Sequence, residues 1–147
     1  MIEPDLQDFY GKVLFKSTGQ EVNIKNVQFV SGGCINTTIK LTTDKGEYFL
    51  KWNEADYEDM FSTEAEGLNL LRSAEKIKIP EIVGLGKIYD KKFLLLEYIN
   101  SGAPSPEYWE KLGHSLAAVH KNSNAQYGLS YDNFIGALPQ KNDFKKE

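Results

Sequence analysis

The sequence predicts an α+β fold: a five-stranded antiparallel sheet with a helix packed against it, followed by a linker and a helical extension. Five runs rich in β-branched and aromatic residues are separated by turn-forming residues. Apolar residues recur at helical spacing near the start of the chain and again over residues 57–74. Residues 100–106 then form a stretch rich in turn formers. We therefore expect a domain over residues 1–99, followed over residues 100–147 by a linker and the start of a second domain.

The composition of the chain indicates which classes of protein it can belong to. A chain of 147 residues with 41% hydrophobic side chains suits one ordinary packed domain. Seventeen basic residues are dispersed among 21 acidic ones, for a net charge of -4, which disfavours nonspecific nucleic-acid binding. The most apolar run, Phe93–Ile99, is too short to span a bilayer, and the first residues do not resemble a signal peptide. We expect a cytoplasmic protein with no membrane partner.

The first half of the chain predicts a helix followed by a meander of strands. Residues 4–17 carry apolar positions at helical spacing. The period then changes to that of strands over Val22–Val30, Ile35–Thr43 and Glu47–Trp52, with turn signals at residues 31–33 and 44–46. Neighbouring strands joined by such short turns pair antiparallel.

Residues 57–74 predict a second helix. One broad apolar arc of this helix contains Phe61, Ala65, Leu68 and Leu71, and Glu64 lies inside the same arc. Beyond Pro80, residues 81–89 and 92–99 predict a hairpin across residues 90–92, which completes five strands.

The second domain begins with the linker at residues 100–106. A helix is expected over about residues 105–122, and its stripe of Leu112, Leu116 and Val119 should cover an apolar surface. Residues 123–147 have no clear period and are predicted to be irregular.

Lys51 and Glu64 are the first candidates for a binding site. A lysine at the end of a strand neutralises phosphate oxygens when its flexible stem is held, and a carboxylate from a helix can hold it. In the alternative interpretation, Lys51 extends from a sheet edge to solvent and Glu64 borders the helix face. The pair alone favours this alternative.

A turn of small residues, Ser31-Gly32-Gly33, lies between the first two strands. It matches neither common glycine-rich nucleotide motif, so taken alone it is best explained as an ordinary hairpin turn. The order of the features favours a site. A small-residue turn, a lysine ending the third strand and a glutamate on the next helix follow one another as in the amino-terminal lobe of a kinase-like fold.

Six segments closely resemble the fructosamine kinase (ketosamine kinase) family: residues 31–36, 48–53, 60–68, 95–98, 112–120 and 132–142. The resemblance runs through nearly all of this chain and covers about the first half of a complete family member. It implies ATP-dependent phosphorylation of a sugar attached to an amine, in a fold similar to aminoglycoside phosphotransferases and protein kinases. Glycated amines or ketosamines would be the acceptors of the complete enzyme.

The resemblance also implies which residues bind the nucleotide. Lys51 would contact the phosphates while Glu64 holds it. The backbone that covers the phosphates would come from Ser31, Gly32, Gly33, Cys34, Ile35 and Asn36. The hinge that meets adenine would be Glu97, Tyr98 and Ile99. From the residues alone, 94–98 is a buried strand with one charged exception.

The chain departs from the family pattern in one respect. The family's aspartate base lies in a later His-Gly-Asp segment, followed by an asparagine and an aspartate that bind magnesium, and none of these appears here. Asp143-Phe144-Lys145 lacks the glycine of a metal-binding Asp-Phe-Gly. We therefore expect no catalytic residue and no metal ligand in this chain, Mg²⁺ only in the complete enzyme, and no turnover by the chain alone.

The remaining candidates keep two interpretations each. Cys34, the single cysteine, is either a small core residue or a redox-active thiol, and the resemblance implies an intermolecular disulfide there. Asp132-Asn133 could contact a substrate, or form an Asx turn. The alternative to a kinase lobe is a noncatalytic nucleotide-binding or redox-linked dimerisation module, a homodimer formed through strand exchange, Cys34 or the stripe on the last helix.

Overall fold

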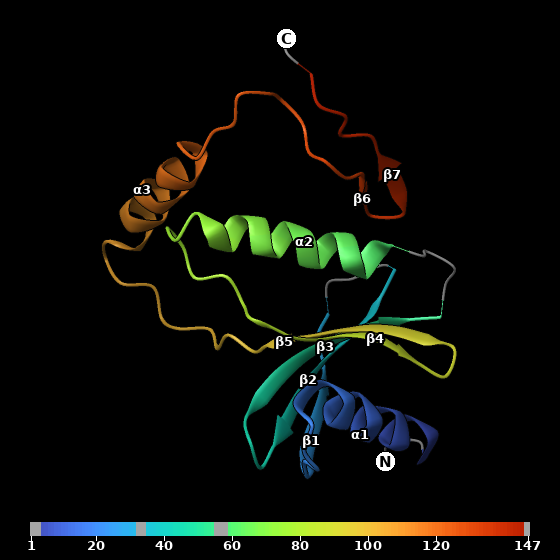
Figure 1. The fold of residues 1–147 in the computed structure, drawn as a ribbon. Helices are drawn as coiled ribbons and strands as arrows, with labels where there is room; N and C mark the ends of the chain where they lie inside the picture. Colours follow the sequence, from blue (N-terminus) through green and yellow to red (C-terminus); the bar gives the residue numbers. More distant parts are fainter. Residues whose placement is uncertain (1–3, 32–34, 55–58, 146–147) are drawn as a thin grey trace. The chain divides into compact units, whose positions relative to one another are not determined.

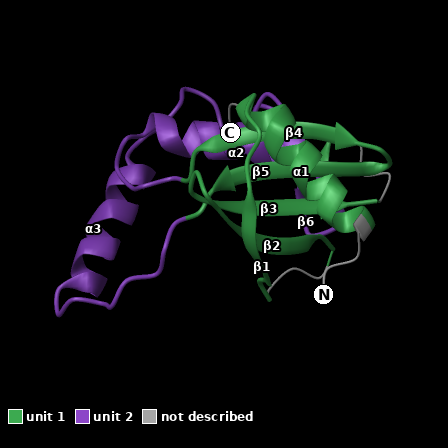
Figure 2. Ribbon diagram, turned by 90° about the horizontal axis from the view of Figure 1, so that it is seen from below, with its two compact units in different colours: residues 1–61, 80–98 green, residues 62–79, 99–147 purple. Residues whose placement is uncertain are grey.

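The structure is a computed structural model that describes residues 4–31, 35–54 and 59–145. The chain divides into two compact units. Unit 1 comprises residues 1–61 and 80–98, and unit 2 comprises residues 62–79 and 99–147 (Figure 2). Each unit is described by itself.

Unit 1 is built on a five-stranded sheet in which every neighbouring pair is antiparallel. The strands are β1 (Ile24–Phe29), β2 (Thr37–Thr43), β3 (Glu47–Asn53), β4 (Ile82–Ile88) and β5 (Lys91–Glu97). Their order across the sheet is β1-β2-β3-β5-β4, so β3 lies at the centre (Figure 2). The predicted five-stranded antiparallel sheet is confirmed.

The turns of the sheet follow from local chemistry. Between β2 and β3, the Thr43 hydroxyl donates to the Gly46 carbonyl at 2.8 Å and accepts from the Lys45 amide at 3.1 Å. Gly46 has a φ of 145°, which a residue with a Cβ rarely adopts. Between β4 and β5 the turn is only Tyr89 and Asp90, since Lys91 already belongs to β5, one residue earlier than the sequence predicts.

Helix α1 (Pro4–Thr18) packs on one face of the sheet (Figure 1). The shared core is almost fully buried and consists of Phe9, Tyr10, Val13 and Leu14 from the helix with Ile39, Leu41, Leu50, Phe93 and Leu95 from the strands. Burial of each large apolar side chain contributes roughly 1.5–3 kcal/mol, so this layer is the main source of unit 1's stability. The helix and β4 approach so closely that a Cβ on Gly84 would lie 2.0 Å from Ser17 Oγ.

Unit 2 contains most of α2 (Met60–Ser73), then α3 (Tyr108–His120) and a hairpin of β6 (Asn133–Ile135) and β7 (Leu138–Gln140) (Figure 1). The first two residues of α2 belong to unit 1. Leu71, predicted on the apolar arc of this helix, is instead 43% exposed. Phe61 and Ala65 of the predicted arc are buried, together with Met60, so the arc is packed in the first half of α2 and exposed at its end.

Two features of the second half of the chain differ from what the sequence predicts. Residues 133–140 form a hairpin where irregular structure was predicted, because strands of three residues are too short to show a period. Gly136, with a φ of 62°, opens its turn. The predicted helix after the linker is present, yet none of its side chains is buried and Leu116 is 49% exposed. Across the described part of the chain, no helix combines the length and the apolar character that crossing a membrane requires.

Candidate functional site

Lys51 lies on the central strand β3, on the face of the sheet opposite α1. Its neighbours Leu50 and Trp52 pack with the α1 core, and side chains alternate along a strand, so Lys51 and Asn53 point away from that core. Lys51 is directly opposite Thr38 on β2 and Leu94 on β5. The residue predicted to bind phosphate is thus half-buried in the middle of a fully paired sheet.

The connection between β1 and β2 begins and ends beside this lysine. The Val30 amide donates to the Thr38 carbonyl at 3.0 Å, and the Thr38 hydroxyl donates to the Val30 carbonyl at 2.6 Å. Because Thr38 is the cross-strand neighbour of Lys51, the base of the predicted phosphate loop lies one strand away from the ammonium-bearing residue. Ser31 is exposed and Ile35 is half-buried. Gly32, Gly33 and Cys34 lie outside the described residues.

A polar cluster that sequence reasoning missed connects the end of this loop to β3 and α2. Asn53 Nδ2 donates to Asn36 Oδ1 at 2.6 Å. Met60 Sδ lies 3.6 Å from Asn36 Nδ2 and 4.0 Å from Asn53 Nδ2. Asn36 therefore directs its side chain inward, although its loop was predicted to cover phosphates. The only sequence signal is a polar residue, Asn53, directly after a strand that ends in lysine and tryptophan.

The predicted hinge begins at the end of β5. The Glu97 amide donates to the Glu81 carbonyl at 2.8 Å, and the Glu81 amide donates to Glu97 Oε2 at 3.3 Å. The Tyr98 amide donates to the Glu47 carbonyl at 3.3 Å. In register, Leu94 is opposite Lys51, so Glu97 is three residues further along β5, about 10 Å away along the strand.

Lys40 is a second cation on the same face of the sheet, and no sequence pattern singles it out. Its Nζ is 2.6 Å from Glu47 Oε1 and 4.1 Å from the centre of the Tyr98 ring. The side chain is 16% exposed, so this ion pair and cation–π contact are shielded from solvent. Lys40 thereby fixes the ring of a predicted hinge residue.

Two predicted site residues belong to unit 2. Glu64 is half-buried on α2, and Ile99 is exposed at the start of the linker. Their relation to Lys51 remains a prediction, as does the ligand role of every residue named for the nucleotide site.

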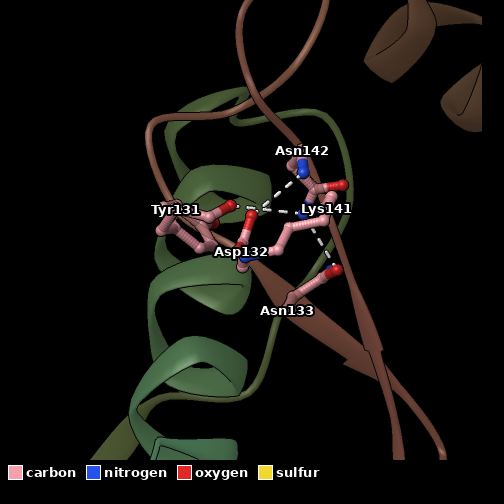
Figure 3. A network of polar contacts seen from close by, with 5 residues as sticks. All are labelled: Tyr131, Asp132, Asn133, Lys141 and Asn142. Atoms are coloured by element: carbon pink, nitrogen blue, oxygen red, sulfur yellow. Dashed lines mark hydrogen bonds and ion pairs between the residues drawn. The ribbon is translucent and has the colours of Figure 1, made fainter.

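In unit 2, Asp132 is the centre of a polar network around the β6–β7 hairpin (Figure 3). Its carboxylate accepts from the Lys141 ammonium and, at 3.1 Å, from the Asn142 amide, and these bonds lower the pKa of Asp132. The Asn142 side chain donates to Asn133 Oδ1 at 2.9 Å and to the Tyr131 carbonyl at 3.2 Å. These contacts give Asp132-Asn133 a structural explanation.

A pocket of about 500 Å³ lies on the other face of the sheet, where Phe9 and Trp52 line it together with acidic residues. Lys91 pairs there with Glu54 at 2.6 Å. Since Trp52 packs toward α1, this pocket is separate from the Lys51 face. Among the described residues, no three His, Cys, Asp or Glu side chains are grouped in a way that could hold a metal ion.

Comparison with known proteins identifies the family. The family model described as fructosamine kinase matches residues 8–147. The chain belongs to the fructosamine kinase family. A Synechocystis protein named as a ketoamine kinase is 37% identical over 128 residues, which are 86% of this chain and 43% of that protein. A protein-ribulosamine 3-kinase from Oryza sativa is 34% identical over 127 residues, 84% of this chain and 37% of its own length. The chain spans less than half the length of these curated kinases.

Solved structures of the fructosamine kinase family share the fold. A Haemophilus somnus structure assigned as a fructosamine-3-kinase matches 93% of this chain with a TM-score of 0.81 and 28% identity. A Thermobifida fusca structure with the same assignment matches 92% with a TM-score of 0.75 and 26% identity. The chain covers 47% and 46% of these two proteins. A spectinomycin phosphotransferase solved with ADP and spectinomycin has a TM-score of 0.59 at 17% identity, which shows the kinase-like fold alone.

Proposed function

We propose that this chain is the ATP-binding part of a fructosamine or ketosamine kinase, which transfers the γ-phosphoryl group of ATP to a sugar hydroxyl of a glycated amine. The observation that carries the proposal is the placement of Lys51. It is half-buried at the centre of the sheet, its cross-strand neighbour Thr38 holds the base of the loop after β1, and the strand beside it leads to Glu97. Family membership supplies the reaction class.

The residues present fit a nucleotide. A lysine on a rigid strand offers a fixed positive charge to phosphate oxygens, and a loop of small residues allows backbone amides to approach them. Lys51 and residues 31–36 would hold the phosphates, and residues 97–99 would meet the base. ATP supplies the phosphoryl group, and the chain's part is to bind and orient it. Mg²⁺ belongs to the complete enzyme in this proposal, because the sequence lacks the family's metal-binding segment.

As part of the same proposal, the chain alone does not catalyse the reaction. Phosphoryl transfer needs an aligned acceptor hydroxyl and neutralised developing charge, which the family's base and metal ligands provide. The sequence contains no His-Gly-Asp segment. The use of ATP and the single cysteine support a cytoplasmic location as part of the same proposal.

Replacement of Lys51 tests the proposed site. We expect Lys51→Met to weaken binding of a fluorescent ATP analogue at least tenfold, because the charge that neutralises phosphate oxygens is lost. Lys51→Arg should retain part of the affinity. Lys25→Met, on the exposed edge strand β1, is the matched control and should bind like the original chain. Equal affinities for Lys51→Met and Lys25→Met would remove Lys51 from the site.

The surface of α3 favours a second candidate, a noncatalytic module that forms homodimers. Trp109 is 75% exposed and no side chain of this helix is buried, and an exposed apolar stripe promotes association. Sedimentation velocity with and without reductant separates the routes. A dimer that dissociates in reductant supports a Cys34 disulfide, and one that persists but is lost in Leu116→Glu supports α3. A monomer under both conditions rules this candidate out.

A further inference from the structure

Three side chains from separate segments of unit 1 meet on the Lys51 face of the sheet. Asn36 precedes β2, Asn53 is the last residue of β3 and Met60 is the first residue of α2. The 2.6 Å bond between the two asparagines spans 17 positions of sequence, and the 3.6 Å contact of Asn36 with Met60 spans 24. The bond between the asparagines extends the β2–β3 ladder by one position beyond the pair Thr37 and Trp52, and the contacts with Met60 join the start of α2 to this end of the ladder.

Burying the Asn53 amide at this position costs free energy of folding. Asn53 is only 6% exposed, and its Oδ1 atom is buried with no hydrogen-bond partner among the described residues. A buried acceptor without a partner loses its hydration and gains nothing in return, so an apolar side chain of similar size would suit stability as well or better. Tyr10 and Trp52 on the α1 side also bury one polar atom each without a partner in the described part of the chain, so this feature alone does not single out Asn53, and the requirement for an amide here must come from its position.

The positions of the three residues indicate that requirement. Asn36 is the last residue of the predicted phosphate loop. Asn53 is two residues after Lys51, so the two side chains share one face of β3. Met60 is four residues before Glu64, so the two lie on the same face of α2.

We propose that Asn53 is a positioning residue that holds the end of the phosphate loop and the start of α2 together, so that nucleotide bound at the loop also fixes the start of α2. This inference rests on the proposed function. Asn53 acts through Asn36 and Met60 and does not itself contact the nucleotide.

The decisive variant is Asn53→Leu in the full chain, which removes both the donor and the unpartnered acceptor at similar volume. We expect binding of the fluorescent ATP analogue to weaken about tenfold, while the melting temperature stays the same or rises. Amide hydrogen exchange of peptides covering residues 35–41 and 59–66 should accelerate together. Asn23→Leu, which removes a side-chain bond of 3.2 Å to Asp44 far from this face, should change neither affinity nor exchange in these peptides.

Two further variants keep the inference falsifiable. The double variant Asn36→Leu with Asn53→Leu should bind nucleotide no more weakly than the worse single variant, since both break one bond. Met60→Leu keeps the volume and should stay within twofold of the original affinity. A lowered melting temperature with unchanged affinity of the folded protein would make Asn53 purely structural and overturn the inference, as would additive losses in the double variant.

Failure of the proposed function would look different. If the original chain binds no nucleotide analogue, the nucleotide site itself is refuted. Hydrogen exchange without nucleotide then still decides whether Asn53 couples the two segments, because Asn53→Leu must loosen both peptides at once. Faster exchange in only one of the two peptides would overturn the coupling.

Discussion

At the scale of single residues, specific contacts hold several charged side chains in position. Lys40 is held between a carboxylate and an aromatic ring, Lys141 is held by Asp132, and Lys51 lies beside the base of a loop. Asn53 has a buried oxygen without a partner among the described residues, at a cost of about 1–3 kcal/mol, and Tyr10, Ser17 and Trp52 each bury one unpartnered polar atom as well. Asn53 differs from them in its bond to Asn36 at the end of the predicted phosphate loop.

The Asp132–Lys141 pair predicts a pH dependence of the β6–β7 hairpin. The Lys141 ammonium and the Asn142 amide lower the pKa of Asp132, and Asp132 raises the pKa of Lys141. The carboxylate therefore contributes stability above its unfolded pKa, near 4, which is lost as the pH falls through the lower folded value. The ammonium's contribution is lost at high pH, as the pH rises through its raised pKa.

A carbon-detected NMR titration of the Asp132 carboxyl tests this prediction. We expect a pKa below the ordinary value that rises toward it in Lys141→Met, and high salt should reduce the shift because the pair is exposed. Lys121→Met, an exposed lysine at the end of α3, serves as the control. An Asp132 pKa identical in the original chain and in Lys141→Met would show that the pair does not form in solution.

At the scale of elements, α1 lies very close to β4. Gly84 faces the backbone of Ser17, with only 3.2 Å between the position of a Cβ on residue 84 and the Ser17 Cα. A side chain there must push the helix from the sheet, although the shared core of Phe9, Val13 and Leu14 holds it in place.

Gly84→Ala should consequently destabilise unit 1. We expect the free energy of unfolding to fall by about 1–3 kcal/mol, the usual cost of overpacking, as measured by urea denaturation. Gly67→Ala is the matched control, because no atom lies within 4 Å of its added Cβ and alanine favours the helix by about 1 kcal/mol. A neutral Gly84→Ala would mean that α1 lies further from β4 in solution.

Most elements of the fold can be predicted because their signals are local. The turn around Gly46 and the β-branched runs on either side determine β2 and β3, and the helical period of residues 4–17 determines α1. The β6–β7 hairpin escaped prediction because its strands are shorter than one readable period. The pairing of β3 with β5, which sets Lys51 opposite Leu94, is also beyond local reasoning, because a helix and another strand separate the two in the chain.

The candidate site was predictable in part. Lys51 and the loop after β1 were proposed from their order in the chain, and the structure brings the loop base and Lys51 together on adjacent strands. Asn53 and Lys40 were missed because their partners are distant in sequence or lie across the sheet, so no spacing rule reveals them. The pairing of Lys51 with Glu64 stays a prediction.

At the scale of the whole molecule, this chain corresponds to less than half of its curated kinase relatives. The match covers the N-terminal part of those proteins. Binding and turnover should therefore be separable in this family.

We expect the purified chain to release no phosphorylated ketosamine above background from fructosyl-lysine, ATP and Mg²⁺, although it binds the nucleotide analogue. A full-length family kinase assayed in parallel serves as the positive control. Mixing the chain with the remaining half of such a kinase should restore some product if the two parts associate. Turnover by the chain alone, abolished in Lys51→Met, would contradict the proposed lack of a catalytic base.

The central place of β3 has a consequence for how the protein loses its structure. A sheet frays from its borders inward, and here the borders are β1 and β4, while β3 has a bonded neighbour on both sides. Heating or mild denaturant should therefore unfold the edge strands first. Lys51 should stay between Thr38 and Leu94 until the whole of unit 1 unfolds cooperatively. Unfolding that begins at the edge strands would therefore displace Lys51 last.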